Sequence, residues 1–196
     1  MPLGAHKAAI MGVAGVSTGD VVLLATESFT NQTSVTFDSE IDSTYKEYIF
    51  KFYNINPATD EARFSFQANA VGGSGYNEPM VTTNFNARHP ESDADNEFVY
   101  VSANDQDNDD AAFQDLQRDQ GNAADESCAG ELHLFNPAST AYVKNFFARI
   151  QGLHSTNNAL DIFVAGYFNT TAAIDDIQFK FSSGNFDGKI KMWGVK

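Results

Sequence analysis

Hydrophobic and polar residues alternate with a period of two along most of the chain. In the stretch "YKEYIFKFYNINPATD", Tyr48, Phe50 and Phe52 fall on one face of an extended segment, and the residues between them fall on the other. In "ARFSFQANAVGGSGYN", Phe64 and Phe66 share a face in the same way. These two stretches are predicted to be adjacent antiparallel strands. The same period predicts further strands at residues 21–26, 33–37, 80–87, 98–102, 131–134, 142–150, 160–168, 177–181 and 189–195.

About ten strands separated by turn signals, with no long amphipathic helix among them, indicate an all-β fold. We expect an antiparallel β-sandwich that is jelly-roll-like. Residues 21–196 are expected to form a single β-sandwich domain, because a chain of 196 residues is an ordinary size for one all-β unit. Residues 1–20 are rich in Gly, Ala and Ser, and they are expected to form an extended N-terminal arm.

Two further segments carry specific expectations. Residues 104–125 are rich in Asp, Asn, Gln and Gly, and this composition predicts a long surface loop. In the last strand, alternation places Ile190 and Met192 over the core, together with Trp193, while the lysines of the segment face outward. Burial of two or three large apolar side chains would keep this strand paired within the sheet.

Composition limits the classes of partner. The formal net charge is -14 with only 12 Lys and Arg residues, which excludes nucleic acid as a partner because phosphate neutralisation needs clustered cations. The apolar runs at 8–16 and 21–25 are broken by Gly, Ser, Thr and Asp well short of the roughly 20 residues that a spanning helix needs. The sequence therefore predicts no membrane span and no signal peptide.

One acidic segment resembles a calcium loop in its spacing. It contains Asp105, Asp107 and Asp109, but Asp110 and Leu116 stand where an EF-hand requires Gly and the bidentate Glu. A solvated acidic loop is the preferred interpretation, and calcium held by these aspartates is the alternative. No other cofactor is expected.

The remaining candidate catalytic groups are scattered. The four histidines have no metal-ligand spacing, and His133 alternates as an outward polar residue of its strand. Cys128, the one cysteine, lacks the basic neighbours that would lower its pKa, so we expect a buried or inert thiol. No Gly-x-Ser-x-Gly positions a nucleophile, and no pair of carboxylates is singled out for glycoside hydrolysis. The sequence therefore predicts a protein without enzymatic activity.

Four tyrosines are the candidate contact residues of the strands and loops: Tyr45, Tyr53, Tyr100 and Tyr142. Amphipathic rings of this kind suit a sugar-stacking platform, and they are equally suited to a subunit interface. We prefer the interface, with Tyr45, Tyr53 and Tyr142 as the partner contacts, and we keep glycan recognition as the alternative.

Several motifs together resemble a family of small structural proteins of marine tailed bacteriophages, described as capsid-decorating, cement or tail proteins. The residues that carry the resemblance are "GAHKAAIMGVAG", "IDSTYKEYIFKFYNINPATD", "AVGGSGYN", "GNAADESCAGELHLFNPASTAYVK", "VAGYFNTT" and "FKFSSGNFDGKIKMWGVK". They cover most of the chain.

The resemblance implies a virion structural protein, located on the outer surface of the capsid or on the tail. Its expected role is a non-enzymatic decoration or cement module that stabilises the particle by binding the major capsid protein or tail proteins, as a homo-trimer. The alternative is a tail or fibre module that recognises host surface glycans. Contacts by the arm are expected at Lys7, Ile10, Met11, Val13 and Val16.

Overall fold

A computed structural model describes residues 20–107 and 111–196. The predicted N-terminal arm, with its contact residues Lys7, Ile10, Met11, Val13 and Val16, lies outside these residues, apart from Asp20. The described chain contains twelve strands and one short 3-10 helix, η1 (Ser102–Asn104). The strands are β1 (Val21–Gln32), β2 (Val35–Phe37), β3 (Glu47–Pro57), β4 (Ala62–Ala70), β5 (Met80–Pro90), β6 (Glu97–Tyr100), β7 (Gln114–Gln120), β8 (Cys128–Phe135), β9 (Lys144–His154), β10 (Asn158–Phe168), β11 (Ile174–Phe181) and β12 (Phe186–Val195).

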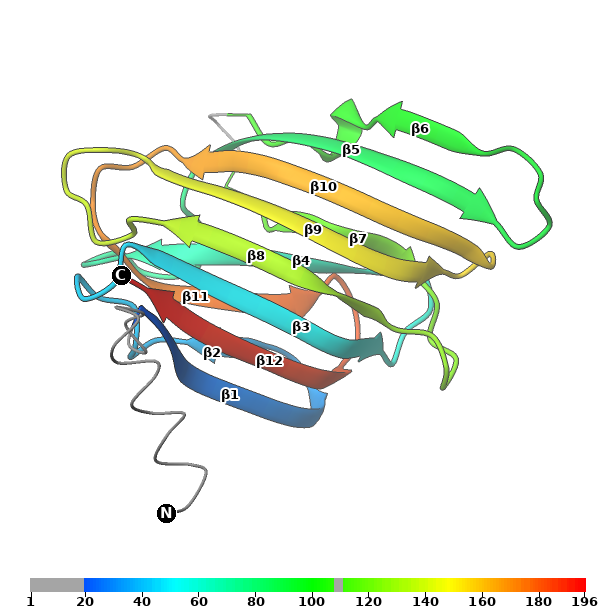
Figure 1. Cartoon of the computed structure of the whole chain (residues 1–196), viewed down its shortest axis with the longest axis horizontal. Helices are drawn as coiled ribbons and strands as arrows, with labels where there is room; N and C mark the ends of the chain where they lie inside the picture. Colours follow the sequence, from blue (N-terminus) through cyan, green and yellow to red (C-terminus); the bar gives the residue numbers. More distant parts are fainter. Residues whose placement is uncertain (1–19, 108–110) are drawn as a thin grey trace, which may run out of the picture.

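The strands form one antiparallel sheet that is nearly closed and barrel-like (Figure 1). It consists of two runs of neighbouring strands. The long run is β1-β12-β3-β8-β9-β10-β5-β6, and the short run is β2-β11-β4-β7. β7 and β9 join the two runs at Gln120 and His154, which are opposite each other. Backbone hydrogen bonds from the Gly121 N–H to the Leu153 carbonyl and from the Ser155 N–H to the Asp119 carbonyl flank this pair. In Figure 1 the short run lies behind the long run.

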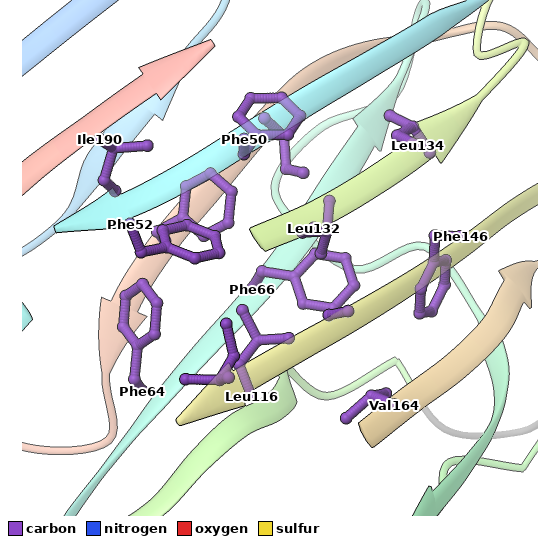
Figure 2. Close-up of a cluster of buried hydrophobic side chains, with 14 of the residues drawn as sticks. Phe50, Phe52, Phe64, Phe66, Leu116, Leu132, Leu134, Phe146, Val164 and Ile190 are labelled. Atoms are coloured by element: carbon purple, nitrogen blue, oxygen red, sulfur yellow. The ribbon is translucent and has the colours of Figure 1, made fainter. Parts of the chain in front are cut away.

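The core fills the space between the two runs (Figure 2). As the alternation predicts, Tyr48, Phe50 and Phe52 of β3 are buried, and so are Phe64 and Phe66 of β4. The predicted adjacency of these two strands is wrong, because β3 pairs with β12 and β8, and β4 pairs with β11 and β7. They face each other instead: the rings of Phe52 and Phe64 meet edge to face with centroids 5.2 Å apart. Side-chain alternation identifies the buried face of a strand but not its hydrogen-bonded neighbours.

The predicted loop at residues 104–125 is wrong in its middle, where β7 lies at the end of the short run. The inward residues of β7 include Gln114, Gln117 and Gln120, so the strand has no apolar alternation to detect. Two of these amides are held by hydrogen bonds. Thr82 Oγ1 donates to Gln114 Oε1 at 2.7 Å, and Gln120 Nε2 donates to the Ile55 carbonyl at 2.6 Å.

The last strand is tied into the sheet on both sides, since β12 pairs with β1 and β3. Ile190 and Met192 are buried as predicted. The expected burial of Trp193 is wrong: it alternates to the opposite side of the strand, where its ring lies near Lys191. Gly194 takes the inward position, and its Cα lies under the ring of Tyr45. Among residues 20–107 and 111–196, no helix has the length and hydropathy to cross a membrane.

Candidate functional site

The outer face is the side of the long run that is turned away from the core. Antiparallel register aligns its side chains in rows across the strands. One row contains Trp193, Ile49, His133 and Phe147, contributed by β12, β3, β8 and β9. The exposed large hydrophobic residues of this face are Val21, Leu23, Tyr53, Phe98, Tyr100 and Phe147.

His133 occupies the centre of the outer face. Its ring stacks on that of Phe147 from β9, with centroids 4.4 Å apart and 15° between the planes. Nδ1 lies 2.5 Å from Glu47 Oε1, and Nε2 lies 3.4 Å from Glu131 Oε1. The side chain faces outward as predicted, but these neighbours leave only 14% of it exposed. His133 is therefore a packed and hydrogen-bonded element of the surface.

Glu131 links this histidine to a lysine. Lys51 Nζ lies 3.3 Å from Glu131 Oε2 on the neighbouring strand. Burial acts to raise the pKa of Glu131, but its interactions with the neighbouring His133 and Lys51 side chains outweigh it, so the pKa is lowered overall. The carboxylate therefore stays ionised beside Lys51.

Arg149 contacts an aromatic cluster on the part of the outer face formed by β10, β5 and β6. Its guanidinium binds Asp161 through two nitrogens, with Nε 3.1 Å from Oδ1 and Nη2 2.7 Å from Oδ2. The same guanidinium lies over the ring of Phe163, 4.8 Å from the centroid. Phe163 stacks on Phe85 of β5 at 4.8 Å, and Phe85 contacts Phe98 of the edge strand β6. Phe98 is 73% exposed, so this cluster ends in an uncovered aromatic ring.

Two open grooves meet at Tyr53. The first has a volume of about 560 Å³ and is lined by Tyr53, Asn54, Asp187, Gly188, Lys189 and Lys191. The second, of about 440 Å³, lies on the other side of the ring and includes Lys51, Glu131, Arg149 and Asp161. The Tyr53 ring is 40% exposed between them.

The four predicted contact tyrosines lie apart from one another. Tyr53 and Tyr100 are both on the outer face, but β3 and β6 are five strands apart, which corresponds to roughly 24 Å. Tyr142 is 72% exposed in the loop between β8 and β9. Tyr45 is half-buried and packs edge to face on Tyr48 with centroids 5.9 Å apart. The prediction that the four tyrosines form a single platform is therefore wrong. Of the four, Tyr53 lines the two grooves together with charged side chains.

Three further residues of the outer face were not predicted as contact residues. Trp193, Phe147 and Arg149 are separated from Tyr53 by long stretches of sequence, and strand register alone places them on one surface. One signal was available in the sequence: Phe146 and Phe147 are adjacent in a predicted strand, so one of the two rings must face outward. In the structure Phe147 is the exposed one.

The acidic segment does not form a metal site among the described residues. No group of three or more His, Cys, Asp or Glu side chains in residues 20–107 and 111–196 is placed to hold a metal ion. Asp105 accepts a hydrogen bond from the Tyr100 hydroxyl, and Asp109 lies outside the described residues. Cys128 is buried as predicted, and burial raises the pKa of its thiol.

No protein-family model matches the chain, and no curated protein matches it significantly.

Proposed function

We propose that this protein is a structural component of a tailed bacteriophage virion, without enzymatic activity, that decorates or cements the capsid by binding other virion proteins. The resemblance of its motifs to marine phage structural proteins is the first support. The observation that carries the proposal is the exposed aromatic outer face, with Phe98, Tyr100 and Phe147 exposed by 73%, 57% and 42%. Exposed aromatic side chains are enriched at protein interaction sites.

The strand pairing supports the jelly-roll architecture that the sequence predicts. Four strands of the long run, β1-β12-β3-β8, and the four of the short run, β2-β11-β4-β7, have nested connections in which first pairs with last and second with second-last. The strands β5 and β6 are inserted between β4 and β7, and β9 and β10 between β8 and β11. Jelly rolls are a recurrent fold of viral capsid proteins, although they also occur in lectins.

The proposed partners are the major capsid protein or tail proteins, and the proposed assembly is a homo-trimer on the outer surface of the capsid or on the tail. An exposed sheet face flanked by edge strands can contact a neighbouring subunit without rearrangement of the core. Tyr53 and Tyr142 remain proposed contact residues because both rings are exposed. Tyr45 is a poorer candidate, since it packs against the core.

Imaging of purified virions at subnanometre resolution tests this proposal. We expect density for this protein on the capsid, with the outer face against a neighbouring subunit. Density confined to a tail fibre tip would contradict the capsid placement. Replacement of Phe98 by Ser is expected to weaken incorporation into particles while leaving the fold intact, because this ring is 73% exposed on an edge strand. Unchanged incorporation of this variant would contradict the assignment of the outer face.

A second candidate function is recognition of host glycans by a tail or fibre module. The specific observation in its favour is the pair of grooves that meet at the exposed Tyr53 ring. Aromatic rings flanked by hydrogen-bonding side chains are suited to sugars. A glycan array probed with the recombinant protein discriminates the two functions, because a cement protein should give no selective binding.

A further inference from the structure

The groove beside Tyr53 is produced by a local irregularity of β3. On one side, Asn56 pairs with Asp187 and Tyr53 with Lys189, so two residues of β3 oppose one of β12. On the other side, the pairing also shifts by one residue between Phe52 and Ile55. Asn54 is the extra residue, and it has a left-handed backbone with a φ of 50°. A bulge of this kind redirects neighbouring side chains and is over-represented next to binding sites.

Glycine is required opposite the bulge. Gly188 has a φ of 151°, which other residues rarely adopt, and a Cβ at this position would lie 3.2 Å from both the Asn54 carbonyl oxygen and Ile55 Cα. The backbone of β12 therefore approaches β3 closely at the floor of the groove, while Lys189 and Lys191 border it. The volume of about 560 Å³ falls in the range of small-molecule sites.

Cations are concentrated around Tyr53 in a chain whose net charge is -14. The linings of the two grooves contain four cations, Lys51, Arg149, Lys189 and Lys191, and three carboxylates, Glu131, Asp161 and Asp187. Lys51 is paired with Glu131, but neither Lys189 nor Lys191 forms an ion pair within residues 20–107 and 111–196. Lys191 Nζ lies 5.8 Å from the Tyr53 ring and 5.9 Å from the Trp193 ring.

The lining of this groove includes one carboxylate, that of Asp187, and it already accepts a hydrogen bond. Asp187 Oδ1 accepts a hydrogen bond from the backbone N–H of Asn31 at 2.6 Å. Two ammonium groups without a paired carboxylate remain beside an exposed aromatic ring. A ligand that has a ring to stack and an anionic group to receive the ammonium hydrogen bonds satisfies both features at once.

We propose that the Tyr53 groove binds an acidic glycan, in which one sugar ring stacks on Tyr53 and its carboxylate or sulfate group contacts Lys189 and Lys191. This proposal rests on the second candidate function, glycan recognition, and assigns it a site and a ligand class. A long nucleic acid does not fit these observations, because two lysines in a strongly acidic protein cannot neutralise a chain of phosphates.

Binding to matched tetrasaccharides tests the proposal. Uronic-acid and sulfated tetrasaccharides are titrated into the full chain beside their neutral counterparts, which are the methyl esters and the desulfated sugars. We expect at least one acidic sugar to bind, more tightly than its neutral partner and less tightly as salt is raised. The double variant Lys189→Gln/Lys191→Gln is expected to lose roughly 10- to 100-fold in affinity for it, the effect of removing one or two charge-assisted hydrogen bonds.

Lys46→Gln/Lys196→Gln is the matched control. It removes the same charge from exposed positions at the other end of β3 and β12, seven residues or roughly 23 Å from Tyr53 and Lys189. We expect it to keep wild-type affinity. Tyr53→Ala is expected to abolish binding, and circular dichroism checks that each variant is folded.

The remaining outcomes separate the two claims. If acidic and neutral sugars bind equally and Tyr53→Ala abolishes both, glycan recognition survives and the acidic ligand class is overturned. If no sugar binds, both are overturned. If an acidic sugar binds but the two lysine variants behave alike, the groove assignment is overturned. Equally tight binding of a short polyglutamate peptide would also overturn the proposal, since charge alone would then explain binding.

Discussion

The ring of His133 in β8 lies almost parallel to the ring of Phe147 in β9, with 4.4 Å between centroids. The two residues are directly opposite in the register of the hairpin, so the contact is a cross-strand pair. The hydrogen bond to Glu47 from the other side fixes the orientation of the imidazole. Because β8 and β9 lie in the middle of the long run, this pair stabilises the centre of the outer face.

This relationship predicts a measurable coupling energy. In a double-mutant cycle of His133→Ala and Phe147→Ala, we expect a coupling of about 0.5–1.5 kcal/mol in the free energy of unfolding, measured by urea denaturation. A cycle of His133→Ala with Phe98→Ala serves as the control and should be additive within about 0.5 kcal/mol, because these rings do not touch. Additive effects in the first cycle would show that the stacked rings contribute no mutual stabilisation.

The core is expected to depend strongly on Phe179 of β11. Its ring contacts Phe50 and Phe52 of the long run and Phe64 of the short run, so it bridges both halves of the core. Phe179→Ala should lower the free energy of unfolding by about 3–5 kcal/mol, through lost burial and the cavity left behind. Phe98→Ala removes the same ring from the outer face and should change stability by about 0.5 kcal/mol or less. Similar losses in both variants would contradict this description of the core.

Stability is expected to fall at alkaline pH through Tyr48. Burial raises its pKa from 10.0 to about 12, with the charge of Asp42 adding to the shift and a backbone hydrogen bond from Asp42 opposing it. The folded pKa lies above the unfolded one, so the stabilisation is complete below pH 10 and is lost as pH rises toward 12. The loss should reach about 1–3 kcal/mol.

Tyr48→Phe isolates this contribution from the other groups that titrate at alkaline pH. The variant lacks the hydroxyl that donates to the Asp42 carbonyl at 3.1 Å, which should cost about 1 kcal/mol at neutral pH. The advantage of wild type over the variant in unfolding free energy is then expected to shrink between pH 10 and pH 12, and to change sign if the loss exceeds the neutral-pH difference. A constant difference over this range would mean that the folded protein does not perturb the ionisation of Tyr48.

Close packing of Tyr45 on Gly194 predicts a compensating pair of substitutions. A Cβ at Gly194 would lie 2.4 Å from Tyr45 Cγ, so Gly194→Ala forces the ring to move. We expect a loss of about 1–3 kcal/mol in thermal or urea unfolding. In a Tyr45→Ala background the same substitution should cost much less, because the obstructing ring is gone. An equal cost in both backgrounds would place the strain in the backbone of β12 instead.

Sequence alternation predicted the all-β class and most of the strands because the two faces of a half-buried strand differ in polarity at every second residue. It assigned Tyr48, Phe50 and Phe52 to the core for this reason. The same reasoning missed β7, because three of its four buried residues are glutamines, two of which form hydrogen bonds with distant residues. It also placed Trp193 over the core, although Gly194 occupies the inward position there.

The sequence by itself therefore determined the secondary structure class, the acidic surface and most of the residues that form the core. The tertiary structure alone decided which strands are neighbours, since local periodicity contains no information about pairing across long sequence separations. In the folded sheet β3 and β4 are not neighbours, and the rings of His133 and Phe147 stack on each other. The extra residue Asn54 forms a bulge beside the groove that Lys189 and Lys191 line. Hydrophobic patterning fixes which side of a strand faces inward, whereas the composition of the outer face depends on register, which only the assembled sheet defines.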